Sequence, residues 1–149
     1  MRVVAGVLYD AGGRVLIAQR PPGKVLAGRW EFPGGKVAAG EPAFDAVVRE
    51  LREELSIEAL RAERLMYYAA VYPQRTIWLD VWVVQDWSGE PRGLDQQAFE
   101  WVEPAQLRAH DILEADAPIV AALVTSASVN TRPRAATRVP PRRTSGSRQ

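Results

Sequence analysis

The chain has 149 residues, of which 47% are apolar and 25% are charged, so its length suits one globular domain with a buried core. It contains no cysteine, which excludes disulfides, thiolate metal sites and a cysteine nucleophile. The net charge of +1 conceals an asymmetry. All charged residues after Asp116 are arginines, whereas the chain before Thr125 is acidic.

The N-terminal half predicts two strands, a long loop and one helix. The first strand, Val3–Tyr9, is too short for a membrane span or a signal peptide core, so we expect a cytoplasmic protein without a membrane partner. A turn and a second strand at Arg14–Gln19 follow, and residues 20–36 are rich in glycine and proline, which indicates an irregular functional loop. Apolar residues at helical spacing predict a helix over Pro42–Leu55.

The C-terminal half predicts further strands and two short helices. The expected strands are Leu65–Tyr72, Thr76–Val84 and Ala98–Val102, with a turn at Trp87–Glu90 after the second strand, and the expected helices are Pro104–His110 and Ala117–Val124. Strands and helices in this mixed order favour an α/β or α+β sandwich.

Residues 125–149 differ in composition from the rest of the chain. Serine, threonine, proline and arginine dominate this segment, and large apolar residues are nearly absent. Because such a segment cannot bury enough surface to offset its ordering entropy, we expect a domain at 1–124 and a disordered tail at 125–149. No aromatic residue is interleaved for stacking, so nucleic-acid binding is expected at most weakly through this tail.

Three carboxylates of the predicted helix lie at chemically suggestive spacing. Glu50, Glu53 and Glu54 stand at i, i+3 and i+4, which puts them on one side of two helical turns. Arg49 and Arg52 flank the cluster, and on its own such a run is also typical of a solvated, salt-bridged face. Hard cations such as Mg²⁺ take oxygen ligands, so a glycine-rich loop before these carboxylates also suits a phosphoryl-transfer site.

The spacing of residues 35–57 carries a family resemblance. Gly35, five residues, Glu41, seven residues and then Arg49-Glu50-Leu51-Arg52-Glu53-Glu54-Leu55-Ser56-Ile57 resemble the Nudix box, a pattern that fixes many positions over 23 residues. The resemblance extends over residues 3–124 to MutT-like members, through the run from Trp30 to Lys36 and the run from Ala115 to Pro118.

The resemblance implies a fold, a cofactor and a reaction. The fold is an α/β/α sandwich with a mixed β-sheet and a catalytic loop-helix-loop. The cofactor is Mg²⁺, for which Mn²⁺ can substitute, and the reaction is cleavage of a nucleoside diphosphate linkage. For a triphosphate, the products are a nucleoside monophosphate and pyrophosphate, and the resemblance leaves open a monomer or a dimer.

Residue roles carry over by position. Glu50 resembles the residue that orients or deprotonates water, Glu41 and Arg49 resemble supporting groups, and which glutamate is the base differs among family members. The implied metal-sphere groups are the Gly34 carbonyl and the carboxylates of Glu50, Glu53, Glu54 and Glu100. Ser56 departs from the pattern, because the family has glycine at this position after the helix.

The base of the nucleotide is implied to lie between Phe32 and Asp116. Asp116 resembles the cytidine-directed relatives, whereas the run Glu31–Lys36 resembles the 8-oxo-dGTP branch, and we favour a sanitising enzyme for 8-oxo-dGTP. Phe32 could equally belong to the core, and Asp116 could instead cap the helix that contains Pro118. Arg20 and Arg75 are candidates for triphosphate or base contacts, although both could also be surface residues.

Rival functions are weighed against these residues. A P-loop is excluded, because Trp30 and Val37 stand where it needs glycine and Ser or Thr. A serine hydrolase would depend on His110, the only histidine, which we expect at a helix end. A non-catalytic Nudix-like binding module usually lacks the box glutamates that persist here. Mg²⁺-dependent pyrophosphate release would separate an enzyme from such a module.

Overall fold

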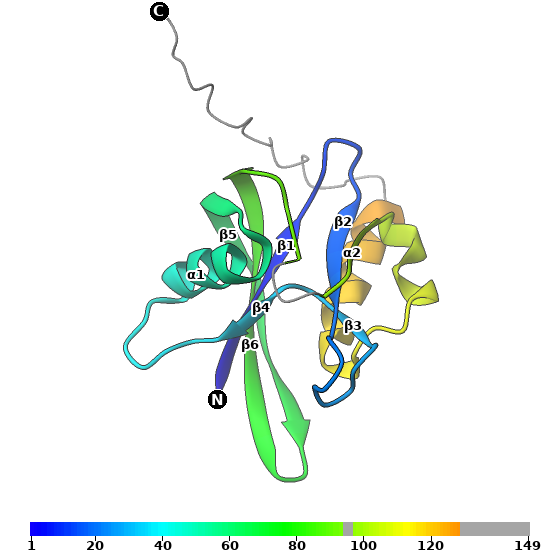
Figure 1. The fold of residues 1–149 in the computed structure, drawn as a ribbon. Helices are drawn as coiled ribbons and strands as arrows, with labels where there is room; N and C mark the ends of the chain where they lie inside the picture. Colours follow the sequence, from blue (N-terminus) through cyan, green and yellow to red (C-terminus); the bar gives the residue numbers. More distant parts are fainter. Residues whose placement is uncertain (94–96, 129–149) are drawn as a thin grey trace, which may run out of the picture.

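The computed structural model describes residues 1–93 and 97–128, and two sheets form its framework (Figure 1). The larger sheet has the order β4-β1-β6-β5, in which β1 and β6 run parallel and the other neighbours antiparallel. Its strands are β1 (Arg2–Leu8), β4 (Gly34–Lys36), β5 (Glu58–Tyr72) and β6 (Arg75–Ser88). The mixed sheet that the resemblance implies is therefore confirmed.

The smaller sheet is antiparallel and has the order β3-β2-β7. Its strands are β2 (Val15–Gln19), β3 (Trp30–Glu31) and β7 (Phe99–Val102). Because β2 follows β1 after a tight turn at Asp10, whose carboxylate accepts from the Gly12 and Arg14 amides, the two sheets are tied together at that end.

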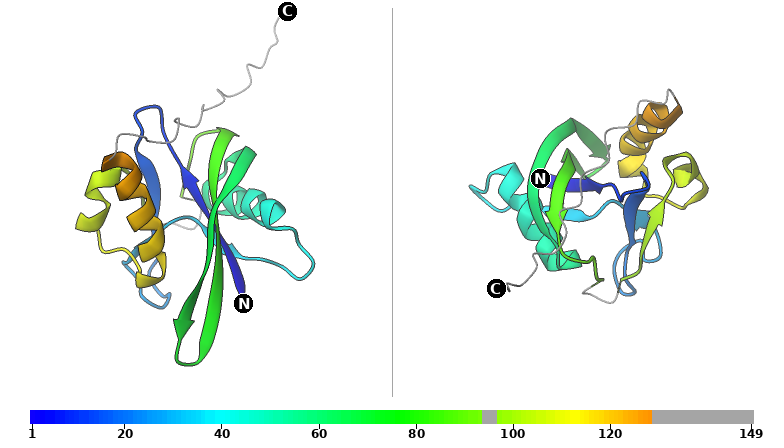
Figure 2. Two further views of the ribbon diagram at one scale, coloured as in Figure 1. Left: turned by 180° about the vertical axis from the view of Figure 1, so that it is seen from behind. Right: turned by 90° about the horizontal axis from the view of Figure 1, so that it is seen from above.

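Two α-helices lie on opposite sides of the strands, as Figure 2 shows from above. Helix α1 spans Ala43–Leu55 and helix α2 spans Ala117–Ser128, and the 3₁₀ helices η1 (Pro104–Ala109) and η2 (Glu114–Asp116) lead into α2. This arrangement confirms an α+β sandwich. No helix of the described residues is long and apolar enough to cross a membrane.

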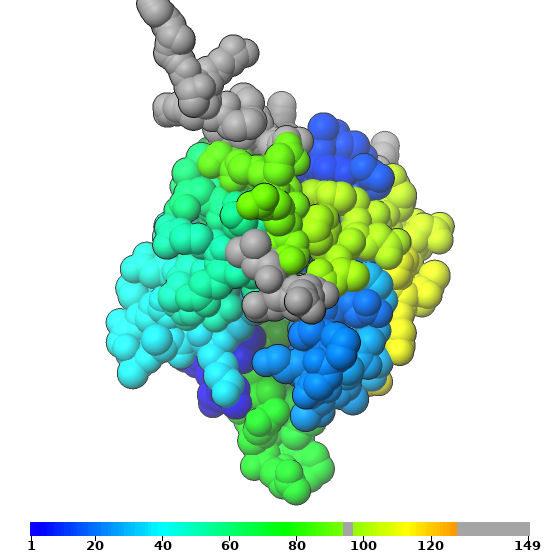
Figure 3. Space-filling model, in the orientation of Figure 1, coloured from blue at the N-terminus to red at the C-terminus, as the bar shows by residue number. Residues whose placement is uncertain are grey.

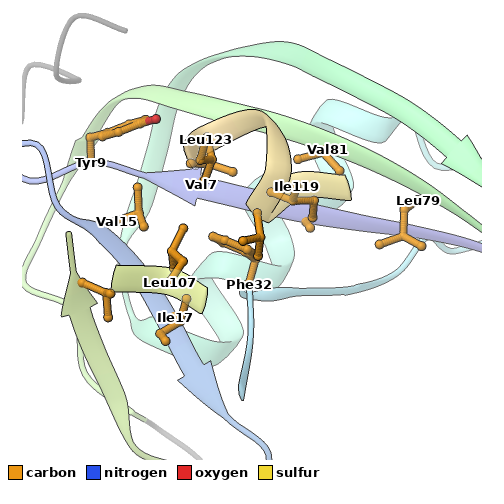
Figure 4. Packing of buried hydrophobic residues seen from close by; sticks show 13 residues of the cluster. Val7, Tyr9, Val15, Ile17, Phe32, Leu79, Val81, Leu107, Ile119 and Leu123 are labelled. Carbon is orange, nitrogen blue, oxygen red and sulfur yellow. The ribbon is translucent and has the colours of Figure 1, made fainter. Parts of the chain in front are cut away.

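Each α-helix covers its own hydrophobic cluster. Helix α1 turns Val47, Leu51 and Leu55 inward, where they pack with β1 and β6 residues such as Trp87. The second cluster joins the other face of β1 to β2, η1 and α2 (Figure 4), with members that include Val7, Ile17, Phe32, Leu107 and Ile119. The helical spacing of the apolar residues in α1 thus corresponds to the face that is buried against the larger sheet.

The glycine-rich loop contains structure that the sequence does not predict. Strands β3 and β4 lie within residues 20–36, where we expect an irregular loop. A Cβ on Gly34 would come within 1.9 Å of the Val4 carbonyl oxygen, so β4 lies too close to β1 for any side chain there. Pairing with a strand distant in sequence therefore orders residues whose composition alone favours a loop.

The remaining elements differ from their predicted bounds mainly in length. Strands β5 and β6 are longer than predicted, and β6 includes Trp87 and Ser88, which we expected in a turn. The predicted helix at Pro104–His110 is a 3₁₀ helix, and α2 extends four residues past Val124 to Ser128. Residues 125–128, predicted as the start of a disordered tail, belong to α2, and the rest of that tail lies outside the described residues.

Candidate active site

Helix α1 presents the predicted carboxylates from a rigid element. It begins after Pro42, and it ends at Ser56, whose backbone is left-handed with φ 60° and whose amide donates to the Arg52 carbonyl. This is the position where the Nudix box has glycine, and the structure confirms that the conformation there favours glycine. Ser56 retains the helix end, so the departure leaves all the carboxylates in place.

Arg49 gathers three of the acidic residues around one guanidinium. Its Nε lies 2.9 Å from Glu41 Oε2, and its Nη1 lies 3.0 Å from Glu50 Oε2 and 3.4 Å from Glu53 Oε1. Its Nη2 donates to the second Glu41 oxygen and to the Lys36 carbonyl, each at 2.9 Å. One arginine thus holds the glycine-rich loop, Glu41 and the helix together, as expected of a supporting group.

Arg49 and burial act in opposite directions on the neighbouring carboxyls. The Arg49 guanidinium and the Ala38 amide lower the pKa of Glu41 to about 2, so Glu41 stays ionised. Burial raises the pKa of Glu50, although Arg49 opposes this shift. Burial therefore gives Glu50 a higher affinity for a proton than an ordinary carboxylate has, which suits a group that orients or deprotonates water.

Gly35 allows the loop backbone to contact Glu50 directly. A Cβ at this position would lie 2.4 Å from the carboxyl carbon of Glu50, so a side chain there would displace the Glu50 carboxylate from its place beside Arg49. The glycine that begins the box therefore lets the loop approach the helix without moving the Glu50 carboxylate. Backbone groups and carboxylates meet there, as a phosphoryl-transfer site needs.

The remaining candidate metal-sphere groups are more dispersed. The Glu53 side chain is 58% exposed, Glu54 is partly buried, and Glu100 extends from β7 opposite Ile17 of β2. Within the described part of the chain, no three His, Cys, Asp or Glu side chains converge closely enough to hold a metal ion. The helix supplies oxygen donors of the type that Mg²⁺ prefers, and the assignment of the full ligand set stays a prediction.

His110 contacts Glu100 in a way that the sequence does not reveal. It ends η1, as predicted for a helix-end residue, and its Nε2 lies 3.2 Å from Glu100 Oε2. The His110 ring also packs edge-on against the Trp30 ring, and their centroids lie 6.1 Å apart. Because Glu100 and His110 belong to different elements, their spacing in sequence gives no signal of this contact.

A second acidic site surrounds Phe32 and Asp116. Phe32 belongs to the buried core, and its backbone amide donates to Asp116 Oδ2 at 2.9 Å. Burial raises the pKa of Asp116 from its ordinary value of 3.8 to about 7. The carboxylate accepts from the backbone between β3 and β4 and not from an α2 amide. The interpretation of Asp116 as a helix cap is therefore wrong.

Glu31 joins this second site and was not among the predicted residues. Burial raises its pKa, and Arg20 Nη1 lies 3.3 Å from its carboxylate. The charge of Glu31 also raises the pKa of Asp116. Arg20 additionally donates from Nε to the Val25 carbonyl at 2.7 Å, so it anchors the 20–29 loop as well as facing Glu31.

Arg75 lies in the larger sheet, away from the carboxylates of α1 and from Asp116. It is the first residue of β6, next to the Pro73–Gln74 turn, and its side chain is exposed. No ion pair joins it to the described residues. The structure therefore does not bring Arg75 to the predicted site, and its role as a substrate contact stays a prediction.

Comparison with known proteins places this geometry in a family. The NUDIX domain model matches residues 1–123. The CTP pyrophosphohydrolase of Escherichia coli strain K12 is 38% identical over 124 residues, 83% of this chain and 91% of its own length. The 8-oxo-dGTP diphosphatase of the same strain is 34% identical over 123 residues, 83% and 95% of the two chains.

A solved structure agrees with these sequence matches. The solution structure of the E. coli ORF135 protein superposes with a TM-score of 0.76 at 37% identity, covering 86% of this chain and 91% of the other. The fold and the carboxylate helix define a hydrolase of phosphoric anhydrides. The chain belongs to the NUDIX family.

Proposed function

We propose that the chain is a Mg²⁺-dependent pyrophosphohydrolase that converts a nucleoside triphosphate to a nucleoside monophosphate and pyrophosphate. One observation carries this proposal: Arg49 holds Glu41, Glu50 and Glu53 together beside the Gly35 backbone. A binding module has no need for an arginine that organises three carboxylates at the end of a glycine-rich loop. We also propose that the chain acts in the cytoplasm.

The oxygen donors of the site fit a hard divalent cation. Burial raises the pKa of Glu50, and the nearby charges of Glu53 and Glu41 add to this effect, so the cluster has negative charge that a cation would neutralise. Bound Mg²⁺, or Mn²⁺ in its place, would neutralise phosphate charge and lower the pKa of a water molecule. The groups proposed to hold it are the Gly34 carbonyl and the side chains of Glu50, Glu53, Glu54 and Glu100.

Glu50 and Arg49 have separate roles in the proposed hydrolysis. Glu50 takes the proton of the attacking water, and Arg49, whose Nη1 lies 3.0 Å from its carboxylate, fixes its orientation. The water oxygen forms a bond to the β-phosphorus while the bond from that phosphorus to the α–β bridging oxygen breaks. The bridging oxygen leaves with the nucleoside monophosphate, and the other two phosphoryl groups leave as pyrophosphate.

Asp116 supports 8-oxo-dGTP as the substrate, because its pKa lies close to neutrality. The protonated carboxyl has an O–H donor in addition to acceptor oxygens, and the ionised form is acceptor-only. 8-Oxoguanine offers the O6 acceptor next to an N7–H donor, so the neutral form can match both groups. Removal of this nucleotide from the precursor pool would make the enzyme a sanitising enzyme that prevents mutations in DNA.

The same residue favours a second candidate, a cytidine triphosphate. The ionised Asp116 carboxylate would accept from the N4 amino group of cytosine, which is a donor on that edge of the base. The two candidates therefore use opposite protonation states of one carboxyl. Raising the pH through about 7, the pKa of Asp116, should shift preference from 8-oxo-dGTP towards CTP.

The test measures initial rates of pyrophosphate release from 8-oxo-dGTP, dGTP, CTP, dCTP and 5-methyl-dCTP on both sides of that pKa. The ratio of the 8-oxo-dGTP and CTP rates cancels the shared pH dependence of the catalytic helix, and Asp116→Asn should make the ratio independent of pH. A strong preference for 8-oxo-dGTP over dGTP supports the sanitising function, and a preference for cytidine nucleotides supports the second candidate. No release from any nucleotide would contradict the proposed function.

A further inference from the structure

Strand β5 is the last strand of the larger sheet. It pairs with β6 alone among the described strands, and the sheet order ends with it. Alternate residues of an antiparallel strand direct their N–H and C=O groups away from its neighbour, so β5 presents a row of unpaired backbone groups. The far end of the β5–β6 hairpin extends beyond the rest of the molecule, as Figures 1 and 3 show in green.

The two halves of β5 differ in how they discourage pairing with another chain. The first half contains charged residues, including Arg61, Glu63 and Arg64, and its register shifts at three places between Ala59 and Met66. Charges and bulges of this kind are the usual protection of an edge strand. The second half, from Met66 to Tyr72, contains no charge, no proline and no register shift.

This unprotected half also exposes large apolar side chains. Val71 is 77% exposed and Tyr67 is 49% exposed, and Trp78 of β6 is 41% exposed beside them. The Tyr67 and Trp78 rings stack with their centroids 5.6 Å apart. The apolar surface is therefore ordered by contacts within the hairpin and is continuous with the free edge.

We propose that the second half of β5 pairs with the same segment of a second copy of this chain to form a symmetric antiparallel dimer. A two-fold axis at Ala69 puts the two Ala69 residues opposite each other and Tyr67 of one subunit opposite Val71 of the partner subunit. Such aromatic and β-branched pairs stabilise neighbouring strands. The pairing extends the sheet across the dimer and uses one surface twice, as an isologous interface requires.

The charges around the segment are compatible with a second copy. Arg64, whose guanidinium lies 5.8 Å from the Tyr67 ring centroid, is engaged by the fully buried Asp80, with its Nε and Nη2 at 2.7 and 2.8 Å from the carboxylate. Arg75, the cross-strand neighbour of Tyr72, is exposed at the end of the hairpin, and the proposed register puts Tyr72 opposite the partner subunit's Met66, so the two Arg75 residues lie at opposite ends of the paired segment. A self-pairing segment without charge brings no like charges together, so the neutral surface fits its own copy.

The available area suits a weak dimer. If pairing covered all of the exposed surface of Leu65, Tyr67, Val71, Tyr72 and Trp78, roughly 500 Å² per subunit, the total of about 1,000 Å² would only reach the lower limit of specific interfaces. The dimer should therefore dissociate on dilution. Because the segment lies on β5, apart from helix α1, the proposal stands or fails independently of the proposed function.

Sedimentation velocity of the full chain tests the proposal. The protein concentration is varied from about 10 µM to about 1 mM, the range in which such an area permits association. The sedimentation coefficient should rise towards that of a dimer, and Val71→Lys should raise the dissociation constant at least tenfold. Val25→Lys is the matched control, since Val25 is 76% exposed on the 20–29 loop. A wild-type chain that stays monomeric throughout would overturn the proposal.

A charge swap at the proposed two-fold axis tests the register. Ala69→Lys and Ala69→Glu should each weaken the dimer, because equal charges would face each other across the axis, and an equimolar mixture should associate again as a mixed dimer. Circular dichroism of each variant checks that the sheet is intact. A wild-type dimer that both Val71→Lys and Ala69→Lys leave unchanged would also overturn the proposal, because association would then use another surface.

Discussion

The catalytic helix and the Asp116 site hold acidic groups in opposite ways. On α1 the carboxylates are partly exposed, and one arginine contacts Glu41, Glu50 and Glu53. Asp116 is buried, and the one hydrogen bond of its carboxylate within the described residues comes from the Phe32 amide. The first arrangement neutralises charge with charge, whereas the second shifts the pKa of the carboxyl towards neutrality.

This difference separates two tasks of a nucleotide hydrolase. A cluster of carboxylates organised by an arginine can attract a cation. A buried carboxyl that titrates near neutrality can instead exchange donor and acceptor roles at a base edge. The predictions below remove one feature of each region, from the largest expected effect to the smallest.

The largest effect is expected from the loss of one helix carboxylate. Glu53→Gln keeps the shape of the side chain but removes its charge, and turnover should fall by several orders of magnitude if Glu53 lies in the metal sphere. Thermal unfolding should stay close to wild type, because this side chain is exposed. Near-wild-type pyrophosphate release by this variant would remove Glu53 from the metal sphere.

Replacement of Arg49 should have a smaller effect than loss of a carboxylate. Arg49→Ala leaves the carboxylates present but releases Glu41 and Glu50, and turnover should fall roughly 10- to 100-fold, as for other groups that orient metal ligands. Arg52→Ala is a matched control on the same helix, because Arg52 pairs with Glu58 of β5. Equal losses in the two variants would contradict the organising role of Arg49.

Asp116→Asn should change stability in a pH-dependent way. The pKa of Asp116 is raised to about 7 in the folded state, so the folded chain binds this proton more tightly than the unfolded chain. The contribution of Asp116 to stability is therefore greatest at low pH and is lost as the pH rises through about 7. The Asp116→Asn variant should unfold at a higher temperature than wild type at about pH 8, with a smaller difference at about pH 5.

The control for this prediction is the difference between the two unfolding curves, since all other titrating groups contribute to both proteins. The Asn side chain retains an acceptor for the Phe32 amide, so the buried hydrogen bond is preserved. A difference in unfolding temperature that stays constant across this pH range would show that Asp116 does not titrate near neutrality.

The smallest effect is expected at the end of α1. Ser56→Gly relieves a non-glycine residue of its left-handed conformation, and the free energy of unfolding should rise by about 1 kcal/mol. Chemical denaturation measures the change, and turnover should be unaltered because no carboxylate moves. Destabilisation by this substitution would indicate that the Ser56 side chain has a stabilising contact of its own.

The sequence predicts features that depend on local spacing. Helix α1 follows from the apolar period of Val47, Leu51 and Leu55, and the structure confirms it within one residue of the predicted start. The Nudix box spacing also predicts which carboxylates share one helix with Arg49. The contact of Gly35 with Glu50 is consistent with the prediction that the loop brings its backbone to the site.

Features that depend on distant pairing are not predicted. Strands β3 and β4 form because β2 and β1 lie beside them, and their glycine-rich sequence has no strand period. The Phe32 to Asp116 hydrogen bond joins residues 84 positions apart, and Glu31 gains its raised pKa only from the burial that this packing creates. Composition and local period contain no information on such contacts.

The most direct test of catalysis at the α1 carboxylates is pyrophosphate release from 8-oxo-dGTP as Mg²⁺ is titrated into the metal-free protein. The account predicts no release in the presence of a chelator, a saturable rise with Mg²⁺, and a product pair of nucleoside monophosphate and pyrophosphate. Release that persists in the chelator, or products of nucleoside diphosphate and phosphate, would contradict it.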